Sequence, residues 1–101
     1  MAIETQHTIC DWADKTFGYA GVDSSIARMV KEVEELKAIK VTEWKDYDKV
    51  ADECADILIT LYRIMGVIGF NLHSCVDHKM EINRGRKWKS NGDGTGQHIK
   101  E

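Results

Sequence analysis

The chain has 101 residues, no proline and a formal net charge of -3; 43% of its residues are hydrophobic and 31% are charged. A chain of this length forms a single domain with one modest core, and this composition is typical of a soluble helical protein. The net negative charge predicts no general attraction to nucleic acid or to anionic membranes, so neither is expected as a partner.

Two helices are predicted in the first half of the chain. Residues 3–16 form a short amphipathic stretch that ends where Gly18 and Gly21 permit a turn. Beyond it, three possible N-cap residues at positions 23–25 precede apolar residues that recur at intervals of three and four. This pattern predicts a second helix that reaches about residue 41.

A third helix is predicted after a connection at residues 42–47, in which Thr42 or Asp46 is expected to provide the cap. Its apolar surface is wider than a stripe, which marks it as the central helix of the fold. The helix is expected to stop near Gly69, because glycine readily takes the left-handed conformation that ends a helix.

The fourth helix is predicted from about Leu72 to Trp88. Residues 1–90 would then form one all-α domain, a four-helix bundle that self-associates because its broad apolar surface exceeds what so small a core can bury. Residues 91–101 are rich in glycine and are expected to form a flexible tail without strands.

Four carboxylates are the first candidate functional residues: Glu32 and Glu35 in the second helix, and Glu53 and Asp56 in the third. Residues three apart share a helix face, and both pairs flank the apolar side of their helix. Because a short connection makes consecutive helices antiparallel neighbours, the pairs are expected to face each other across a groove. Carboxylate oxygens suit hard cations, which predicts two or more Mg2+ or Mn2+ ions. For either pair alone, a solvated helix face is the alternative.

Other metal sites fit the sequence less well. A di-iron site in a helical bundle expects Glu-x-x-His, whereas a carboxylate stands three residues after each glutamate here. The spacings of His7 with Cys10 and of His73 with His78 are weak indications of zinc. The three cysteines are well separated and form no C-x-x-C pair, which indicates reduced cytoplasmic thiols. No signal peptide or membrane-spanning segment is expected.

A row of polar and basic side chains lies near the end of the predicted fourth helix. Lys79, Asn83 and Arg86, called the basic row below, stand at intervals of four and three and share one helix face. An ammonium, an amide and a guanidinium in line can hold phosphate oxygens. The alternative is that these cations only complement the helix dipole. Together with an acidic metal groove, the row favours binding and cleavage of a polyphosphate.

These three elements resemble those of the MazG-like all-α nucleoside triphosphate pyrophosphohydrolases, which carry E-x-x-E on one helix, E-x-x-D on the next and then a Lys/Asn/Arg segment. The matching residues here are Glu32, Glu35, Glu53, Asp56, Lys79, Asn83 and Arg86. The resemblance covers roughly residues 10–90. One departure is Lys31, which stands where many members have a further glutamate, and which alters the outer ligand shell.

Both ends of the chain extend the resemblance to a phage and bacterial subgroup. Residues 11–18, Trp88, Gly94 and His98 are similar to those of dATP/dGTP pyrophosphohydrolases, including the MazZ enzymes of phages that replace adenine by 2-aminoadenine. The resemblance implies that a purine deoxynucleoside triphosphate, dGTP or dATP, is cleaved to a monophosphate and pyrophosphate in nucleotide-pool control. It also implies a homodimer or homotetramer, located in the host cytoplasm if the protein is phage-encoded.

In the mechanism that we hypothesise, the four carboxylates bind the metal ions and one of them accepts a proton from the attacking water. Glu35 is the candidate base because it is central, and Glu53 is the second candidate catalytic residue. The basic row neutralises the leaving pyrophosphate. Trp12 and Phe17, and less directly Trp44, are candidates to stack on the base, with core packing as the alternative.

Two interpretations without catalysis stay open. One is a helical interaction protein whose acidic faces are only solvated, and the other is a sensor that binds a nucleotide without cleaving it. Metal and nucleotide should stabilise an enzyme or a sensor against heat, because both bind the ligand only when folded, whereas an interaction protein should not respond. Product analysis separates the enzyme from the sensor.

Overall fold

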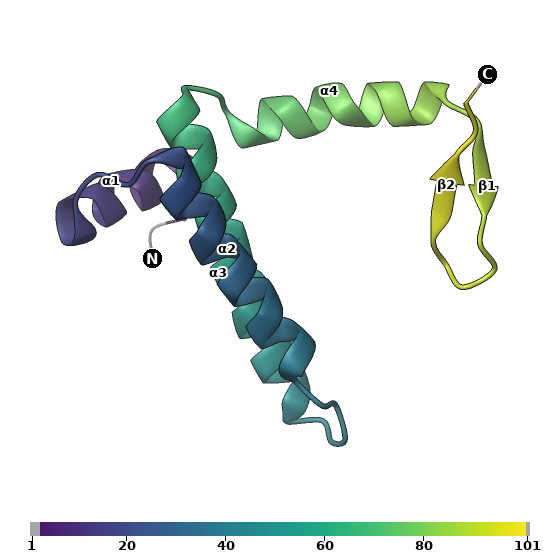
Figure 1. Ribbon diagram of the computed structural model, residues 1–101, viewed down its shortest axis with the longest axis horizontal. Coiled ribbons are helices and arrows are strands. Elements are labelled where there is room, and N and C mark those ends of the chain that lie inside the picture. Colours follow the sequence, from purple (N-terminus) through teal and green to yellow (C-terminus); the bar gives the residue numbers. More distant parts are fainter. Residues whose placement is uncertain (1–2, 101) are drawn as a thin grey trace.

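The computed structural model describes residues 3–100 and contains four helices followed by a small β-hairpin (Figure 1). The helices are α1 (Gln6–Phe17), α2 (Val22–Ala38), α3 (Asp46–Ile68) and α4 (Leu72–Gly85). The strands are β1 (Trp88–Ser90) and β2 (Gly96–His98). The predicted all-α class is confirmed, with the four helices in the expected order.

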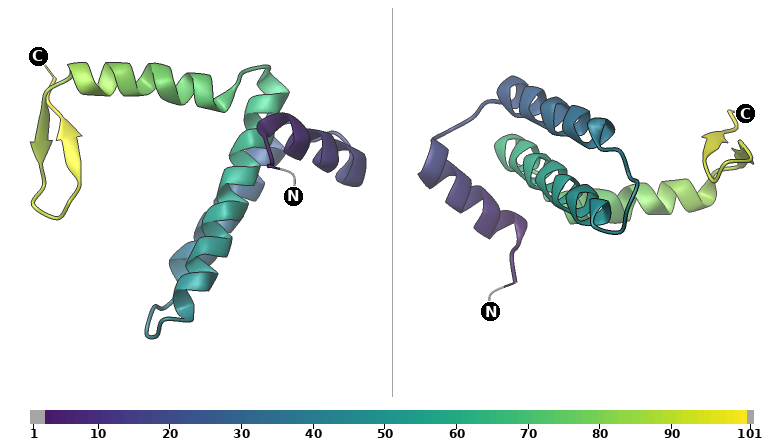
Figure 2. Two further views of the ribbon diagram at one scale, coloured as in Figure 1. Left: turned by 180° about the vertical axis from the view of Figure 1, so that it is seen from behind. Right: turned by 90° about the horizontal axis from the view of Figure 1, so that it is seen from below.

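Helices α2 and α3 form an antiparallel pair that lies side by side in every view (Figures 1 and 2). Asp46 orders their connection, because its Oδ2 accepts hydrogen bonds from the Thr42 and Glu43 backbone N–H groups at 2.9 and 3.0 Å. These backbone bonds lower the pKa of Asp46 to about 2. The predicted cap of α2 is wrong: Gly21 occupies the N-cap position, and residues 23–25 lie inside the first turn.

Helix α1 packs across the upper part of α3 (Figure 2). The two helices approach closely at Gly66, where a Cβ atom would come within 2.8 Å of the Cys10 Sγ. Arg63 of α3 holds the other end of α1, since its Nη2 donates to Asp14 Oδ1 at 3.3 Å and to the Gly18 carbonyl at 3.2 Å. These contacts hold α1 against α3, and α1 forms one wall of the site described below.

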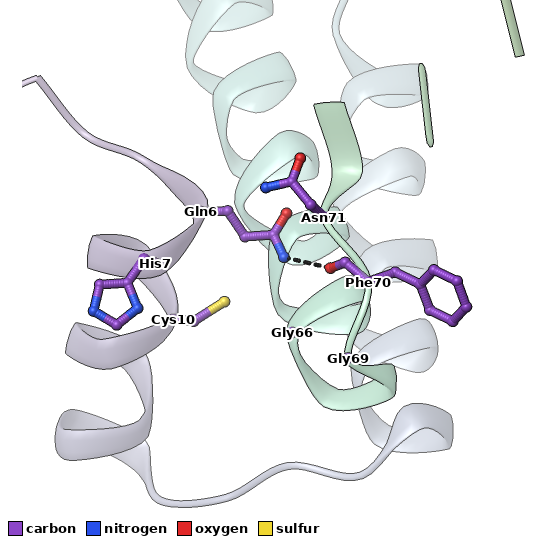
Figure 3. A pocket seen from close by; sticks show the side chains of 7 residues that line it. All are labelled: Gln6, His7, Cys10, Gly66, Gly69, Phe70 and Asn71. Atoms are coloured by element: carbon purple, nitrogen blue, oxygen red, sulfur yellow. Dashed lines mark hydrogen bonds between the residues drawn. The ribbon is translucent and has the colours of Figure 1, made fainter. Parts of the chain in front are cut away.

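A sharp corner separates α3 from α4, whose axes meet at 98°. Gly69 ends α3 in the left-handed conformation (φ 79°), and Asn71 caps α4 by accepting a hydrogen bond from Ser74 N–H at 3.0 Å. Gln6 of α1 holds this corner, because its side-chain amide donates to the Phe70 carbonyl at 2.8 Å (Figure 3). The same amide accepts a hydrogen bond from Leu72 N–H, also at 2.8 Å. One side chain therefore satisfies the backbone groups on both sides of the turn.

Replacing Gln6 by alanine should lower the free energy of unfolding by about 1–3 kcal/mol, because the partly buried Leu72 N–H loses its partner. Thermal unfolding of the two proteins measures the effect. Gln97→Ala is the matched control, since Gln97 is an exposed glutamine of β2, outside the corner. Equal melting temperatures for wild type and Gln6→Ala would show that the corner is held without this amide.

The end of the chain differs from the prediction. Helix α4 stops at Gly85 instead of Trp88, and residues 88–90 pair antiparallel with residues 96–98, so the expectation that the chain has no strands was wrong. Two glycines with positive φ, Gly92 and Gly94, allow the intervening turn. Strands of three residues are too short to give a readable alternation of polar and apolar positions.

The helices enclose little core within one chain. Among hydrophobic side chains of residues 3–100, only those of Ala13 and Tyr62 are buried. Helix α4 projects away from α2 and α3 and does not close a bundle with them in the same chain (Figure 1). No single helix in this range is long and apolar enough to cross a membrane; only the bent pair α3 with α4 passes that test of length and composition.

Candidate metal and nucleotide site

Three of the four predicted carboxylates come together between α2 and α3. Oxygen atoms of Glu32, Glu35 and Glu53, called the acidic cluster below, all lie within 4.8 Å of one another. Glu32 and Glu35 share a face of α2 because they are one turn apart, and the antiparallel packing brings Glu53 of α3 opposite them. Glu32 is only 4% exposed and Glu35 lies at the solvent side.

The negative charge of the acidic cluster is only partly balanced. Within residues 3–100, the buried Oε2 atoms of Glu32 and Glu53 have no hydrogen-bond partner, and the cation bonded to the cluster is Arg28, whose Nη2 lies 2.6 Å from Glu32 Oε1. Burial raises the pKa of Glu53 to about 7, followed by a hydrogen bond to Glu32 that can form only while Glu53 is protonated, and by repulsion from Glu35. Buried carboxylate oxygens without partners are costly, so this group suits a divalent cation with oxygen ligands.

The stability of the metal-free protein should therefore fall as the pH rises. The pKa of Glu53 is raised from its ordinary value of 4.5 to about 7, so the unfolded chain loses this proton first. The contribution of protonated Glu53 to stability is complete below about pH 4.5 and is lost as the pH rises through about 7. The measurement is the melting temperature in chelator between pH 5 and 8.

In that experiment Glu53→Gln should make the melting temperature fall less steeply as the pH rises, because glutamine does not titrate and needs no shared proton. Glu34→Gln, at an exposed position of α2 outside the acidic cluster, is the matched control and should keep the decline. A decline that is equally steep in wild type and Glu53→Gln would assign the pH dependence to other groups.

A cavity of about 530 Å3 adjoins the acidic cluster between α1, α2 and α3. Its lining residues are Trp12, Phe17, Arg28, Glu32, Asp56, Ile59, Thr60 and Arg63. The volume is within the range of pockets that bind small molecules. Asp56, the fourth predicted carboxylate, lies in this wall and not among the three clustered glutamates. Trp12 and Phe17 also meet here, edge to face, with ring centroids 5.4 Å apart.

The basic row is not brought to this cavity within one chain. Lys79 and Asn83 lie on α4 and Arg86 caps it, and α4 runs away from the α2–α3 pair (Figures 1 and 2). Trp44 is also remote, since it lies in the connection at the far end of that pair, is 86% exposed and packs against Tyr47. Neither Trp44 nor the basic row is among the cavity's lining residues in the described part of the chain.

Sequence reasoning missed the cavity's two guanidinium groups. Arg28 lies four residues before Glu32, which is one turn on the same face of α2. Arg63 lies seven residues after Asp56, two turns further along the same face of α3. The spacing of these two arginines from the carboxylates was the signal in the sequence that could have identified them. The weak zinc candidates stay apart from any metal group, because the three clustered glutamates are the only such group within residues 3–100.

Comparisons with known proteins point to one family. Residues 5–101 match the model of the dATP/dGTP pyrophosphohydrolase family. A dATP/dGTP diphosphohydrolase of Salmonella phage PMBT28 is 33% identical over 96 residues, which are 95% of this chain. The chain spans only 31% of the length of that relative.

A solved structure shares the fold. It is the MazG-like pyrophosphohydrolase of cyanophage S-2L, bound to dGDP and three catalytic Mn2+ ions per active site. It is 25% identical to this chain with a TM-score of 0.76, and the similarity covers 95% of this chain and 90% of that one.

Proposed function

The chain belongs to the dATP/dGTP pyrophosphohydrolase family, and we propose that it hydrolyses dGTP or dATP to the deoxynucleoside monophosphate and pyrophosphate. The observation that carries this proposal is the acidic cluster, in which two buried carboxylate oxygens lack a partner beside a cavity of nucleotide size. The three Mn2+ ions in the similar cyanophage enzyme support a divalent cofactor, for which we propose Mg2+ or Mn2+. Such an activity would serve the control of purine deoxynucleotide pools.

The acidic cluster and Asp56 would hold the metal ions. When bound, divalent ions neutralise the triphosphate and make a water molecule more acidic. Glu35 is our candidate to accept the proton of that water, because it is the exposed member of the acidic cluster and can pass the proton on to solvent. Glu32 and Glu53, which are more enclosed between the helices, are fixed more firmly and are better suited to hold ions.

The nucleoside would lie in the cavity beside the cluster. Trp12 and Phe17 contribute the aromatic surface of this cavity, so a base can rest against one of their rings. Both side chains are more than half exposed, at 57% and 69%, which leaves them open to a ligand instead of filling a core. This exposure favours the predicted stacking role over the packing alternative.

A single chain exposes more surface than a folded monomer should. The accessible area is 8115 Å2, whereas a folded monomer of 11.5 kDa is expected to expose about 5,800 Å2. The radius of gyration is 16.5 Å, against an expected value of about 13 Å. Large apolar residues are exposed on all four helices, and those of α2, α3 and α4 include Val30, Leu58, Ile68, Val76 and Met80. We propose that a second copy covers these faces, as a homodimer or within a homotetramer.

Self-association would also complete the site. Because α4 leaves its own α2–α3 pair at the corner, its basic row lies away from the acidic cluster of the same chain, which supports a role at the acidic cluster of another copy. We therefore propose a shared site, with the acidic cluster from one chain and Lys79, Asn83 and Arg86 from its partner.

The test of the function is incubation of the purified protein with each deoxynucleoside and ribonucleoside triphosphate, with and without Mg2+ or Mn2+. Ion-exchange chromatography separates the products. Metal-dependent release of monophosphate and pyrophosphate in equal amounts is expected for dGTP or dATP. If no nucleotide is cleaved under any condition, the proposed activity is withdrawn.

A further inference from the structure

A second, smaller cavity of about 60 Å3 adjoins the nucleotide cavity. Arg28, Thr60 and Arg63 line both cavities. The smaller cavity, called the annex below, is also lined by Ser25 of α2, which is 6% exposed. The Ser25 Oγ is buried and has no hydrogen-bond partner within residues 3–100. A buried hydroxyl without a partner is costly, which indicates that a ligand group completes it.

Two guanidinium groups line the annex, and each is paired with a carboxylate outside it, Arg28 with Glu32 and Arg63 with Asp14. Arg63 is 19% exposed in its side chain, and both of its hydrogen bonds to α1 are made by the single nitrogen Nη2. Thr60 Oγ1 already donates to the Ile57 carbonyl at 2.6 Å and can only accept further bonds. No carboxylate from the described part of the chain lines the annex. A group that enters it should therefore carry hydrogen-bond acceptors.

The annex lies one nucleoside length from the acidic cluster. Ser25 precedes Glu32 by seven residues on α2, and Thr60 follows Glu53 by seven residues on α3. Seven residues are two helical turns, roughly 10 Å, and they return to the same face of the helix. A nucleotide whose phosphates lie at the acidic cluster would thus pass Trp12 and Phe17 and bring the far edge of its base to the annex.

We propose that the annex reads the edge of the base and selects 6-oxopurines, of which guanine is one. Guanine offers two acceptors, O6 and N7, on one edge, whereas adenine replaces O6 by an amino group that is itself a donor. That amino group would face the guanidinium of Arg63, which has only donors, so adenine would form no hydrogen bond with it there. Ser25 and Arg63 are thereby specificity-determining residues, an inference that rests on the proposed nucleotide site.

The test is calorimetric titration of the full chain, in Mn2+, with the monophosphates dGMP, dIMP and dAMP. dIMP keeps O6 and N7 but lacks the 2-amino group, so its affinity tests recognition of the O6 and N7 edge alone. The wild type should bind dGMP and dIMP at least roughly tenfold more tightly than dAMP. Ser25→Val fills the annex and should reduce that ratio by a similar factor, and Ser25→Ala should reduce it less. Ala27→Ser, on the same helix but lining neither cavity, is the control.

Each outcome of the titration either supports or overturns the selectivity proposed for the annex. An unchanged dGMP to dAMP ratio in Ser25→Val, or equal affinity of the wild type for both, would overturn the inference even if hydrolysis is observed. Retained selectivity for dGMP without any hydrolysis would support the annex and count against the proposed activity alone. Absence of binding by all three nucleotides would overturn the inference about the annex, whereas the activity is decided by the hydrolysis assay.

Discussion

Replacement of Glu53 by glutamine is expected to lower the Mn2+-dependent turnover of dGTP by at least about 100-fold, the loss typical of removing one group that stabilises the transition state. Glutamine has nearly the same shape but no negative charge. Glu53 lies in the acidic cluster with one oxygen buried and unpaired, so the change removes charge where the metal ions are proposed to bind. The α2–α3 packing should persist, because the substitution adds no bulk.

Two measurements separate loss of the site from loss of the fold. Circular dichroism in chelator should show a folded protein, and the melting temperature should no longer rise on addition of Mn2+, because binding to the folded state is the source of that rise. Glu34→Gln, at an exposed position of the same helix, should keep both turnover and the rise. Normal turnover by Glu53→Gln would refute the assignment of the acidic cluster as the metal site.

Two inactive variants are expected to restore activity to each other when they occupy one oligomer. Glu53→Gln disables the acidic cluster, and a Lys79→Ala/Arg86→Ala variant disables the basic row. If each site combines the cluster of one chain with the row of its partner, a mixed dimer holds one intact site and one doubly damaged site. The mixed dimer should then show about half of the wild-type activity.

The experiment uses co-expression with two affinity tags and purification through both, so that only mixed oligomers are assayed. The matched control pairs Glu53→Gln with Glu32→Gln, which damage the same acidic cluster and cannot complement each other. Mixed oligomers that form but stay as inactive as either parent variant would show that the site is built within one chain.

Much of the site could be predicted from the spacing of residues along single helices. Two carboxylates three residues apart must share a helix face, so the pairs Glu32 with Glu35 and Glu53 with Asp56 could be recognised without knowing the fold. The structure brings three of them together and places Asp56 in the wall of the adjoining cavity. Which oxygens converge depends on the register of α2 against α3, and this register follows from packing along the whole length of the pair.

The basic row shows where local spacing fails. Its residues are aligned on one helix, and the sequence predicted their alignment but not their direction in space. That direction is set by a turn at Gly69 and by the Gln6 side chain, which comes from more than sixty residues away in the chain. The terminal hairpin was missed because three-residue strands carry no usable periodicity.

The sequence by itself determined the four helices, the acidic pairs and the alignment of the basic row, because apolar periodicity and side-chain spacing on a helix depend only on near neighbours. Only the tertiary structure decided that α4 leaves its own chain's acidic cluster, that one oxygen of Glu53 lies buried in that cluster, and that Ser25, Thr60 and Arg63 meet in the annex. Each of these depends on contacts between residues distant in sequence, where hydrogen bonds and helix register act together.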